Sequence, residues 1–158
     1  MTFFIHGDPK GQPRPRAFAR KMGAKYVARV YDSDVADEWK RAVDQAIVRE
    51  YFERRPAFLE HKLVFDEGLP FEVVATFWMR RPKSHFNAQG FVKPNAPVRH
   101  AQKPDADNLV KLVLDRITRS DLIWRDDSQV AYLTVAKYWA DKDENVGCNL
   151  TLQPLSTT

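Results

Sequence analysis

The chain has little of what a secreted, disulfide-linked or membrane-spanning protein needs. Its single cysteine, Cys148, excludes an internal disulfide and a zinc cluster built from cysteines. Its apolar runs fall far short of the about 20 residues of a membrane span. The first residues also lack the charged and apolar stretches of a signal peptide. These absences predict a protein of the reducing cytoplasm without a membrane segment.

Acidic residues are scarce in two segments. Residues 1–31 carry seven Lys or Arg against Asp8 alone, and residues 79–104 carry six Lys or Arg and no acid, although the net charge of the whole chain is +4. The remainder is therefore acidic. Two basic segments beside an acidic remainder are typical of a protein that holds a phosphate backbone against carboxylate-bound metal. Solvated loops that are basic for solubility are the alternative interpretation.

The candidate DNA contacts lie in an N-terminal arm of about residues 8–29 and in a basic loop of about residues 80–104. Both segments contain Pro and Gly and are interleaved with aromatic or His residues. Prolines around Arg14 hold the arm extended, because the residue before a proline favours extended geometry. The candidates are Arg14, Arg16, Arg20, Lys21, Arg80, Arg81, Lys83, Arg99 and Lys103.

Residue patterns along the 158 residues predict one small α+β domain, a mixed β-sheet packed against two main helices. Apolar residues at helical spacing predict one helix over about residues 35–53 and a second after Pro104. Residues 71–79 are rich in β-branched and aromatic side chains, as central strands are. Further strands are expected over 3–6, 26–31, 130–139 and 146–152, the last two forming a hairpin.

Six aspartates and no glutamate lie between Asp105 and Asp127. Asp105 and Asp107 surround the start of the second helix, and Asp126 and Asp127 precede a strand. Short carboxylates from two chain segments suit Mg²⁺, so all four are candidate metal ligands. Phosphoryl transfer is the usual chemistry of such a site. Lys111, one turn after Asp107, is a candidate for orienting water or offsetting charge on the phosphate.

Each of these residues also has a purely structural interpretation. Asp105 is placed to cap the helix, and the pair Asp126–Asp127 suits an ordinary polar turn. Lys111 could bridge Asp107 and Asp115 along the helix surface. The sequence leaves these alternatives open.

Three more polar or aromatic residues near the acids allow two interpretations. Asn108 could bond locally at the helix start or orient a carboxylate. Trp124 and Trp139 are read as core residues more readily than as a platform for stacking bases.

In combination these residues resemble the signature of RusA-type Holliday junction resolvases. The run from Lys103 to Lys111 contains Asp-x-Asp-Asn-x-x-Lys, and Asp126-Asp127-Ser128-Gln129 matches the later element Asp-Asp-x-Gln. Residues 7–16 and 30–32 are similar to the amino-terminal half of the phage and prophage branch. The resemblance spans most of the chain and is tightest over residues 103–137.

The resemblance implies a homodimeric α+β endonuclease of DNA recombination and repair. It would use Mg²⁺, or Mn²⁺ in its place, to cut opposed strands of four-way DNA junctions by paired symmetric nicks. The products would carry ligatable 5′-phosphate and 3′-hydroxyl ends. The essential acids of the family map onto Asp105, Asp107 and Asp127, with Asp126 adjacent, and its catalytic lysine onto Lys111. The basic loop is longer than in the shortest relatives.

Two other functions are considered. One is a non-catalytic protein that binds branched DNA. The other is a small-molecule phosphatase, which would place its Asp-x-Asp directly after an apolar strand, whereas Lys103-Pro104 precedes Asp105. Paired symmetric cuts require two sites related by a two-fold axis, so a homodimer is expected. Its interface is expected at the final hairpin or at the helix after Asp105.

Overall fold

The structure is a computed structural model that describes residues 1–13, 16–22, 25–31, 34–54, 63–65 and 68–156. Within residues 16–22, 25–31 and at 34 it describes the backbone alone. A four-stranded sheet forms the centre, in the spatial order β1 (Thr2–His6), β6 (Gly147–Pro154), β4 (Phe71–Met79) and β5 (Val130–Trp139). β6 is antiparallel to both neighbours, whereas β5 is parallel to β4. The sheet is therefore mixed, as predicted.

The predicted hairpin between the last two strands is wrong. β4 lies between β5 and β6 and pairs with both. Its residues alternate between buried and half-buried, and this pattern suits the middle of a sheet covered on one face. A parallel neighbour requires a crossover connection, which the second helix supplies before β5. A short 3₁₀ turn over Asp143–Asn145 then leads to β6 on the other side of β4.

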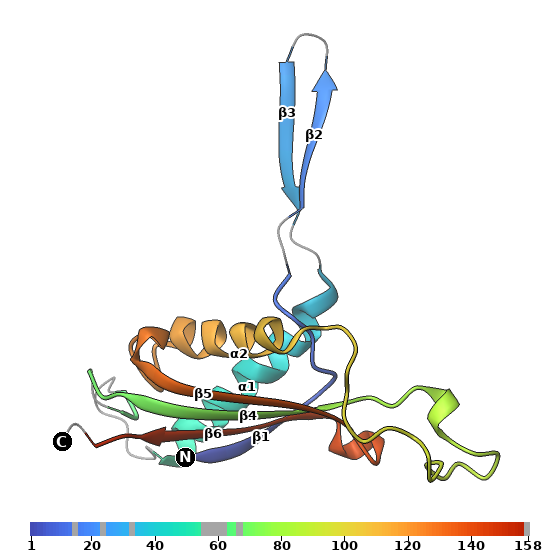
Figure 1. The fold of residues 1–158 in the computed structure, drawn as a ribbon. Coiled ribbons are helices and arrows are strands. Elements are labelled where there is room, and N and C mark those ends of the chain that lie inside the picture. The colour runs from blue at the N-terminus through green and yellow to red at the C-terminus, as the bar shows by residue number, and fades with distance from the viewer. Residues whose placement is uncertain (14–15, 23–24, 32–33, 55–62, 66–67, 157–158) are drawn as a thin grey trace.

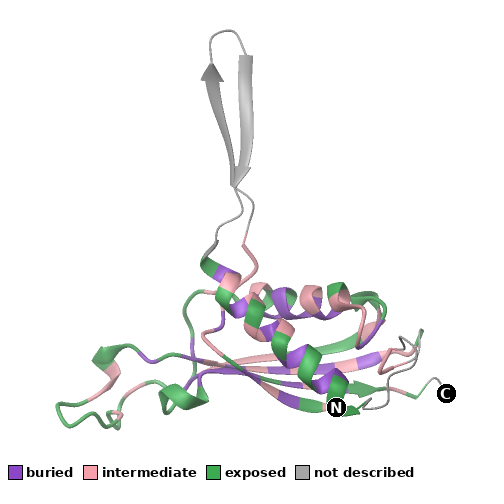
Figure 2. Ribbon diagram, turned by 180° about the vertical axis from the view of Figure 1, so that it is seen from behind, coloured by how far each residue is buried: buried purple, intermediate pink, exposed green. Residues whose placement is uncertain are grey.

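Both predicted helices are present, and both cover the same face of the sheet (Figures 1 and 2). α1 spans Asp37–Arg54 and α2 spans Ala106–Ser120. The residues that face the sheet are buried and apolar at helical spacing: Trp39, Val43, Ala46 and Ile47 in α1, and Leu109, Leu112, Val113 and Ile117 in α2. This layer of helices on a sheet confirms the α+β class.

An ion pair joins the two helices. The Arg116 guanidinium donates from Nε to Asp44 Oδ1 at 2.7 Å and from Nη2 to Asp44 Oδ2. The hydrogen bonds that Arg116 donates to this carboxylate raise the pKa of Arg116 above its ordinary value. Paired donors of this kind favour one orientation of the two helices.

The N-terminal arm contains a hairpin that forms a separate two-stranded sheet. β2 (Arg16–Met22) pairs antiparallel with β3 (Lys25–Tyr31), and Figure 1 shows the hairpin standing away from the helices. The predicted strand over 26–31 is confirmed, whereas β2 was expected only as extended chain. Of the candidate DNA contacts, Arg14 lies outside the described residues, and Arg16, Arg20 and Lys21 are described by backbone only.

The basic loop, residues 80–104, connects β4 to α2 and contains one 3₁₀ turn over Lys83–His85. It also contains an isolated bridge between Phe86 and Val92 and another from Arg99 to Tyr138 of β5. No helix in the described part of the chain is both long and apolar enough to cross a membrane.

Candidate active site

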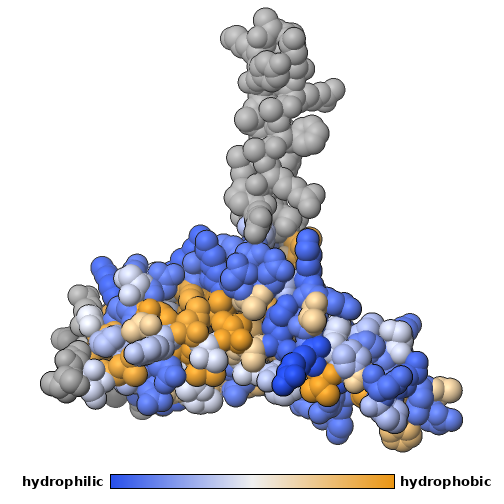
Figure 3. All heavy atoms as spheres, in the orientation of Figure 1, coloured by the Kyte–Doolittle hydropathy of each residue, from blue (hydrophilic) through white to orange (hydrophobic). Residues whose placement is uncertain are grey.

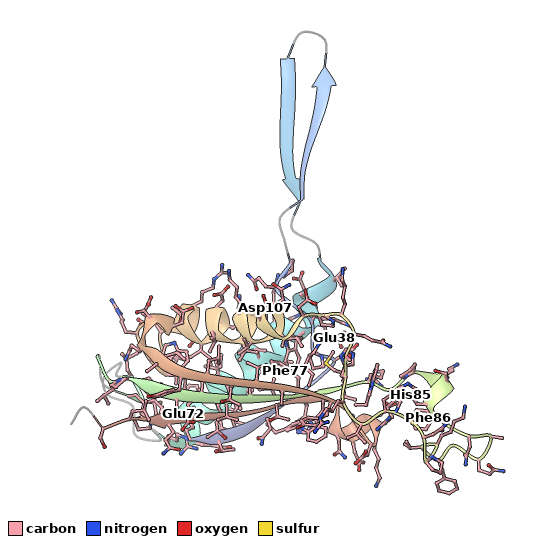
Figure 4. The ribbon with its side chains drawn as sticks, viewed as in Figure 1. Glu38, Glu72, Phe77, His85, Phe86 and Asp107 are labelled. Atoms are coloured by element: carbon pink, nitrogen blue, oxygen red, sulfur yellow. The ribbon has the colours of Figure 1, made fainter. Side chains whose placement is uncertain are left out.

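Asp105 and Asp107 stand at the start of α2 with exposed side chains (Figure 4 labels Asp107). Asp105 occupies the N-cap position with extended backbone, as predicted, but its side chain makes no capping hydrogen bond. Neither carboxylate has an ion pair or hydrogen bond with any residue that the structure describes. Capping therefore does not account for Asp105, whose carboxylate is free to bind a ligand.

Lys137 holds the peptide that leads to Asp105. Its Nζ donates to the carbonyl oxygens of Gln102 at 2.8 Å and Pro104 at 2.7 Å. Lys137 is half-buried near the end of β5, and no acid of the described chain forms an ion pair with it. Lys137 is the last residue of the stretch in which the family resemblance is tightest, but no role could be assigned to it from the sequence. The feature that could have indicated a role is the position of this lysine between Val135 and Trp139, on the face of the strand that is turned toward the helices.

The segment before the hairpin lies against the same helix start. Gln12 N donates to Asn108 O at 2.9 Å. A Cβ atom on Gly11 would lie 3.3 Å from the Cβ atoms of both Asn108 and Pro104, a tight contact that favours glycine there. The arm and the basic loop therefore meet at the end of the molecule that carries Asp105.

Lys111 lies one turn into α2 with an exposed side chain. Its ammonium makes no ion pair with Asp107, Asp115 or any other acid in the described ranges. The alternative in which Lys111 bridges two acids of the helix surface is therefore not observed. The ammonium remains available near the two carboxylates.

Asp127 begins a 3₁₀ turn, Asp127–Gln129, that precedes β5, and Asp126 is the N-cap of this turn. Asp126 Oδ1 accepts from Ser128 N at 2.9 Å, and Gln129 Oε1 accepts from Asp126 N at 3.2 Å. The hydrogen bonds from Ser128 lower the pKa of Asp126. Asp127 is exposed, and its carboxylate is unpaired within the part of the chain that the structure describes. Asp126 thus shapes the turn, and Asp127 is the freer carboxylate.

The two acid pairs lie at opposite ends of α2 and β5. Pro104, next to Asp105, is bound by Lys137 near the end of β5, whereas Asp127 comes shortly before Val130 at its start. A 15-residue helix is about 22 Å long, so Asp105 and Asp127 of one chain are about 20 Å apart. Among the described residues, no three His, Cys, Asp or Glu form a group that could hold a metal ion. The metal site expected from the sequence therefore stays a prediction.

The candidate DNA contacts of the basic loop differ in exposure. Arg81 has a side chain only 3% exposed, and it donates from Nε to Ala140 O and from Nη1 to Pro97 O, both at 2.9 Å. The structure therefore argues against Arg81 as a DNA contact, because its donors anchor the loop. Arg80 pairs with Asp143 at 2.8 Å. Lys83, Arg99 and Lys103 are exposed.

Trp124 and Trp139 are core residues, as expected. Trp124 is fully buried, and Trp139 is 6% exposed. Trp124 packs on Phe71 at a ring-centroid distance of 5.6 Å. Neither is available as an open platform for bases.

Comparison with known proteins gives a class for this arrangement. The family model of the endodeoxyribonuclease RusA matches residues 6–150, nearly the whole chain. The chain therefore belongs to the RusA family of Holliday junction resolvases and is a nuclease by class. It is also 27% identical over 152 residues to the uncharacterized protein YqaN of Bacillus subtilis (strain 168), covering 90% of this chain and 89% of that protein.

Proposed function

We propose that the protein is a divalent-metal-dependent endonuclease that resolves four-way DNA junctions by paired symmetric nicks. The observation that supports this best is the pair of exposed, unbound carboxylates, Asp105 and Asp107, at the end of the molecule where the arm and the basic loop meet. A phosphate backbone drawn there by positive charge would lie beside them. The products would carry 5′-phosphates and 3′-hydroxyls, and the acting form would be a homodimer.

The free edge of β5 supports a dimer. Residues 98–100 cover only its last part, where Trp139 N donates to Val98 O at 2.9 Å and His100 N to Lys137 O at 3.1 Å. Along residues 130–136 the described chain offers no further strand on that side. This stretch has no charged residue, and Leu133 is 47% and Tyr132 65% exposed. Uncharged, exposed strand edges pair readily with another strand.

Apolar side chains gather on this face of the molecule, over β5 and beneath α2 (Figure 3). Antiparallel pairing of two copies about Leu133 would align residue 130 of one strand with residue 136 of the other. Asp127 of the partner subunit would then approach the end of β5 where Lys137 holds the peptide before Asp105. Each site would combine Asp105 and Asp107 of one protomer with the partner's Asp127.

The chemistry of the donor set fits Mg²⁺, which is commonly bound by one or two carboxylates together with substrate phosphate. When bound, such an ion acidifies the attacking water and stabilises the leaving oxyanion, and Mn²⁺ would substitute. Asp105, Asp107 and the partner subunit's Asp127 would hold it, with Asp126 keeping the turn of Asp127 in shape. The Lys111 ammonium would offset charge that develops on the phosphate.

The direct test is cleavage of a labelled four-way junction in Mg²⁺ or Mn²⁺. We expect paired nicks at symmetric positions, binding that weakens steeply with salt, and an Asp127→Asn protein that binds but does not cut. Junction binding without cleavage in either metal would instead favour a non-catalytic DNA-binding protein, which the lack of a three-acid group in the described part of one chain leaves as the second candidate.

Mixing two inactive variants tests the shared site. A heterodimer of Asp105→Asn and Asp127→Asn protomers would contain one doubly altered site and one intact site. We expect the mixture to regain activity as a single, unpaired nick in one strand of the junction. A mixture of Asp105→Asn with Asp107→Asn is the matched control and should stay inactive, because both of its sites are altered. Equal inactivity of both mixtures, with exchange of subunits verified by mass, would rule out the shared arrangement.

A further inference from the structure

The basic loop carries a closed turn at its tip. Asn87 Oδ1 accepts from Gln89 N at 3.0 Å and Phe91 N at 2.9 Å, and Asn87 N donates to Phe91 O at 2.8 Å. Phe86 and Val92 bridge across the base of this turn, and Gly90 has the positive φ of 83° that it requires. The turn Phe86–Val92 therefore holds its shape by its own hydrogen bonds.

Contacts with the sheet also fix the loop behind this turn. Arg81 donates to Ala140 and Pro97 from a buried position. The rings of His85 and His100 pack on Trp139 at centroid distances of 5.0 Å and 4.2 Å. Lys93 Nζ donates to Ser84 O at 2.8 Å. The basic loop is thus held in a fixed shape that exposes its tip. Figure 4 shows His85 and Phe86 on this loop, beyond the end of the sheet.

The tip presents an aromatic side chain to solvent. Phe91 is 70% exposed, the most exposed large aromatic residue of those that the structure describes. The loop around it has six Lys or Arg and no acid. Exposing a phenyl ring on an ordered turn gains nothing for the fold itself, and the surrounding charge matches a polyanion.

We propose that Phe91 stacks on a nucleobase that is freed from the duplex at a DNA branch point. The inference rests on the proposed function and extends it, because it assigns to this loop recognition of unpaired bases in addition to contact with phosphates. Aromatic side chains inserted between base steps, or stacked on single-stranded bases, bind in this way without reading sequence. Asn87 supports the contact by holding the turn before DNA binds.

The test uses the full-length protein without added divalent metal and a four-way junction with 2-aminopurine beside the branch point. We expect wild type to raise the fluorescence of the probe as bases unstack. Phe91→Ala should weaken junction binding about fivefold or more, and linear-duplex binding less than about twofold, because one base–aromatic stack is lost. The fluorescence rise should fall with it, and Phe91→Trp should restore both.

Two further variants separate stacking from loop structure. Gln89→Ala alters an exposed residue of the same turn and should leave binding unchanged. Asn87→Ala should weaken binding although Phe91 remains, because the turn loses two hydrogen bonds. If wild type binds the junction and Phe91→Ala matches it in affinity and fluorescence, the inference is overturned and the proposed function stands. If the wild-type protein does not bind junctions, both the stacking of Phe91 and the proposed function are overturned.

Discussion

The two acid pairs have the same composition but different surroundings. Asp105 and Asp107 keep both carboxylates free, because Lys137 and Gln12 hold their helix start from outside. Asp126 uses its carboxylate to close its own turn, which leaves Asp127 as the free acid. One end of the molecule thus has two free carboxylates at a helix start that Lys137 and Gln12 support, and the other has one free carboxylate on a turn that Asp126 stabilises. Neither pair belongs to a group of three possible metal ligands among the described residues, and the shared site proposed above would combine the two pairs across a dimer.

The largest expected effect comes from blocking the edge that would join the two ends. Leu133→Lys places an ammonium at the centre of the free β5 edge, where burial of an unpaired charge costs several kcal/mol. We expect a monomer and a loss of nicking of at least about a hundredfold. Sedimentation and the junction assay measure both. Val48→Lys, at a side chain 42% exposed on α1, is the control and should change neither. A Leu133→Lys protein that is dimeric and active contradicts the arrangement.

A smaller effect is expected from removing the support of the first acid pair. Lys137→Met keeps the length of the side chain but loses the two donors that hold Gln102 and Pro104. Nicking should fall about tenfold to a hundredfold and recover in part at higher Mg²⁺ concentration, as for other residues that orient metal ligands. The pKa of His100 should rise, because it is lowered by burial and secondly by the Lys137 ammonium, which this variant removes.

The control for this variant is Lys142→Met, whose side chain is 73% exposed and forms only a distant pair with Glu144. It should leave both the metal dependence and the His100 titration as in wild type. Unchanged nicking and an unchanged His100 pKa in Lys137→Met would show that Lys137 does not position Asp105.

The two residues of the second acid pair, Asp126 and Asp127, should have different roles, one in stability and the other in nicking. Asp127→Ala is expected to abolish nicking at unchanged thermal stability, because its exposed carboxylate forms no hydrogen bond or ion pair in the described chain. Asp126→Ala is expected to retain most nicking but to melt at a lower temperature, because the turn loses its cap. Thermal unfolding monitored by circular dichroism, together with the junction assay, separates the two. Reversed outcomes would make Asp126 the ligand.

The smallest effect concerns pH. Burial, and secondly the Lys137 ammonium, lower the pKa of His100 from its ordinary value of 6.5. The unfolded chain therefore binds a proton before the folded chain does. The contribution of His100 to stability is full above pH 6.5 and is lost as pH falls through the folded pKa. Denaturant unfolding from about pH 7 to pH 5 should show this decline.

His100→Phe is the matched variant for this decline. It keeps a ring against Trp139 and removes the buried Nδ1, which has no hydrogen-bond partner in the described chain. Its stability should depend less on pH over the same range. An identical slope in both proteins would assign the decline to other groups.

Local patterns in the sequence determined much of this protein. Apolar residues at helical spacing sufficed for α1 and α2, and the alternation along residues 71–79 sufficed for a central strand, because each depends on one element burying one face. The position of Asp105 at a helix start was likewise local. So was the family signature, since it is a matter of residue types and spacing.

Only the tertiary structure decided which elements and side chains lie next to one another. It placed β4 between β5 and β6, buried Arg81 among carbonyls, gave Lys137 its two acceptors and separated Asp105 from Asp127 by the length of a helix. Spacing along the chain carries no such information, because the neighbour that a strand joins after a helix depends on which edge of the sheet is still unpaired. The acids that stand close in the sequence signature are therefore far apart in one folded chain.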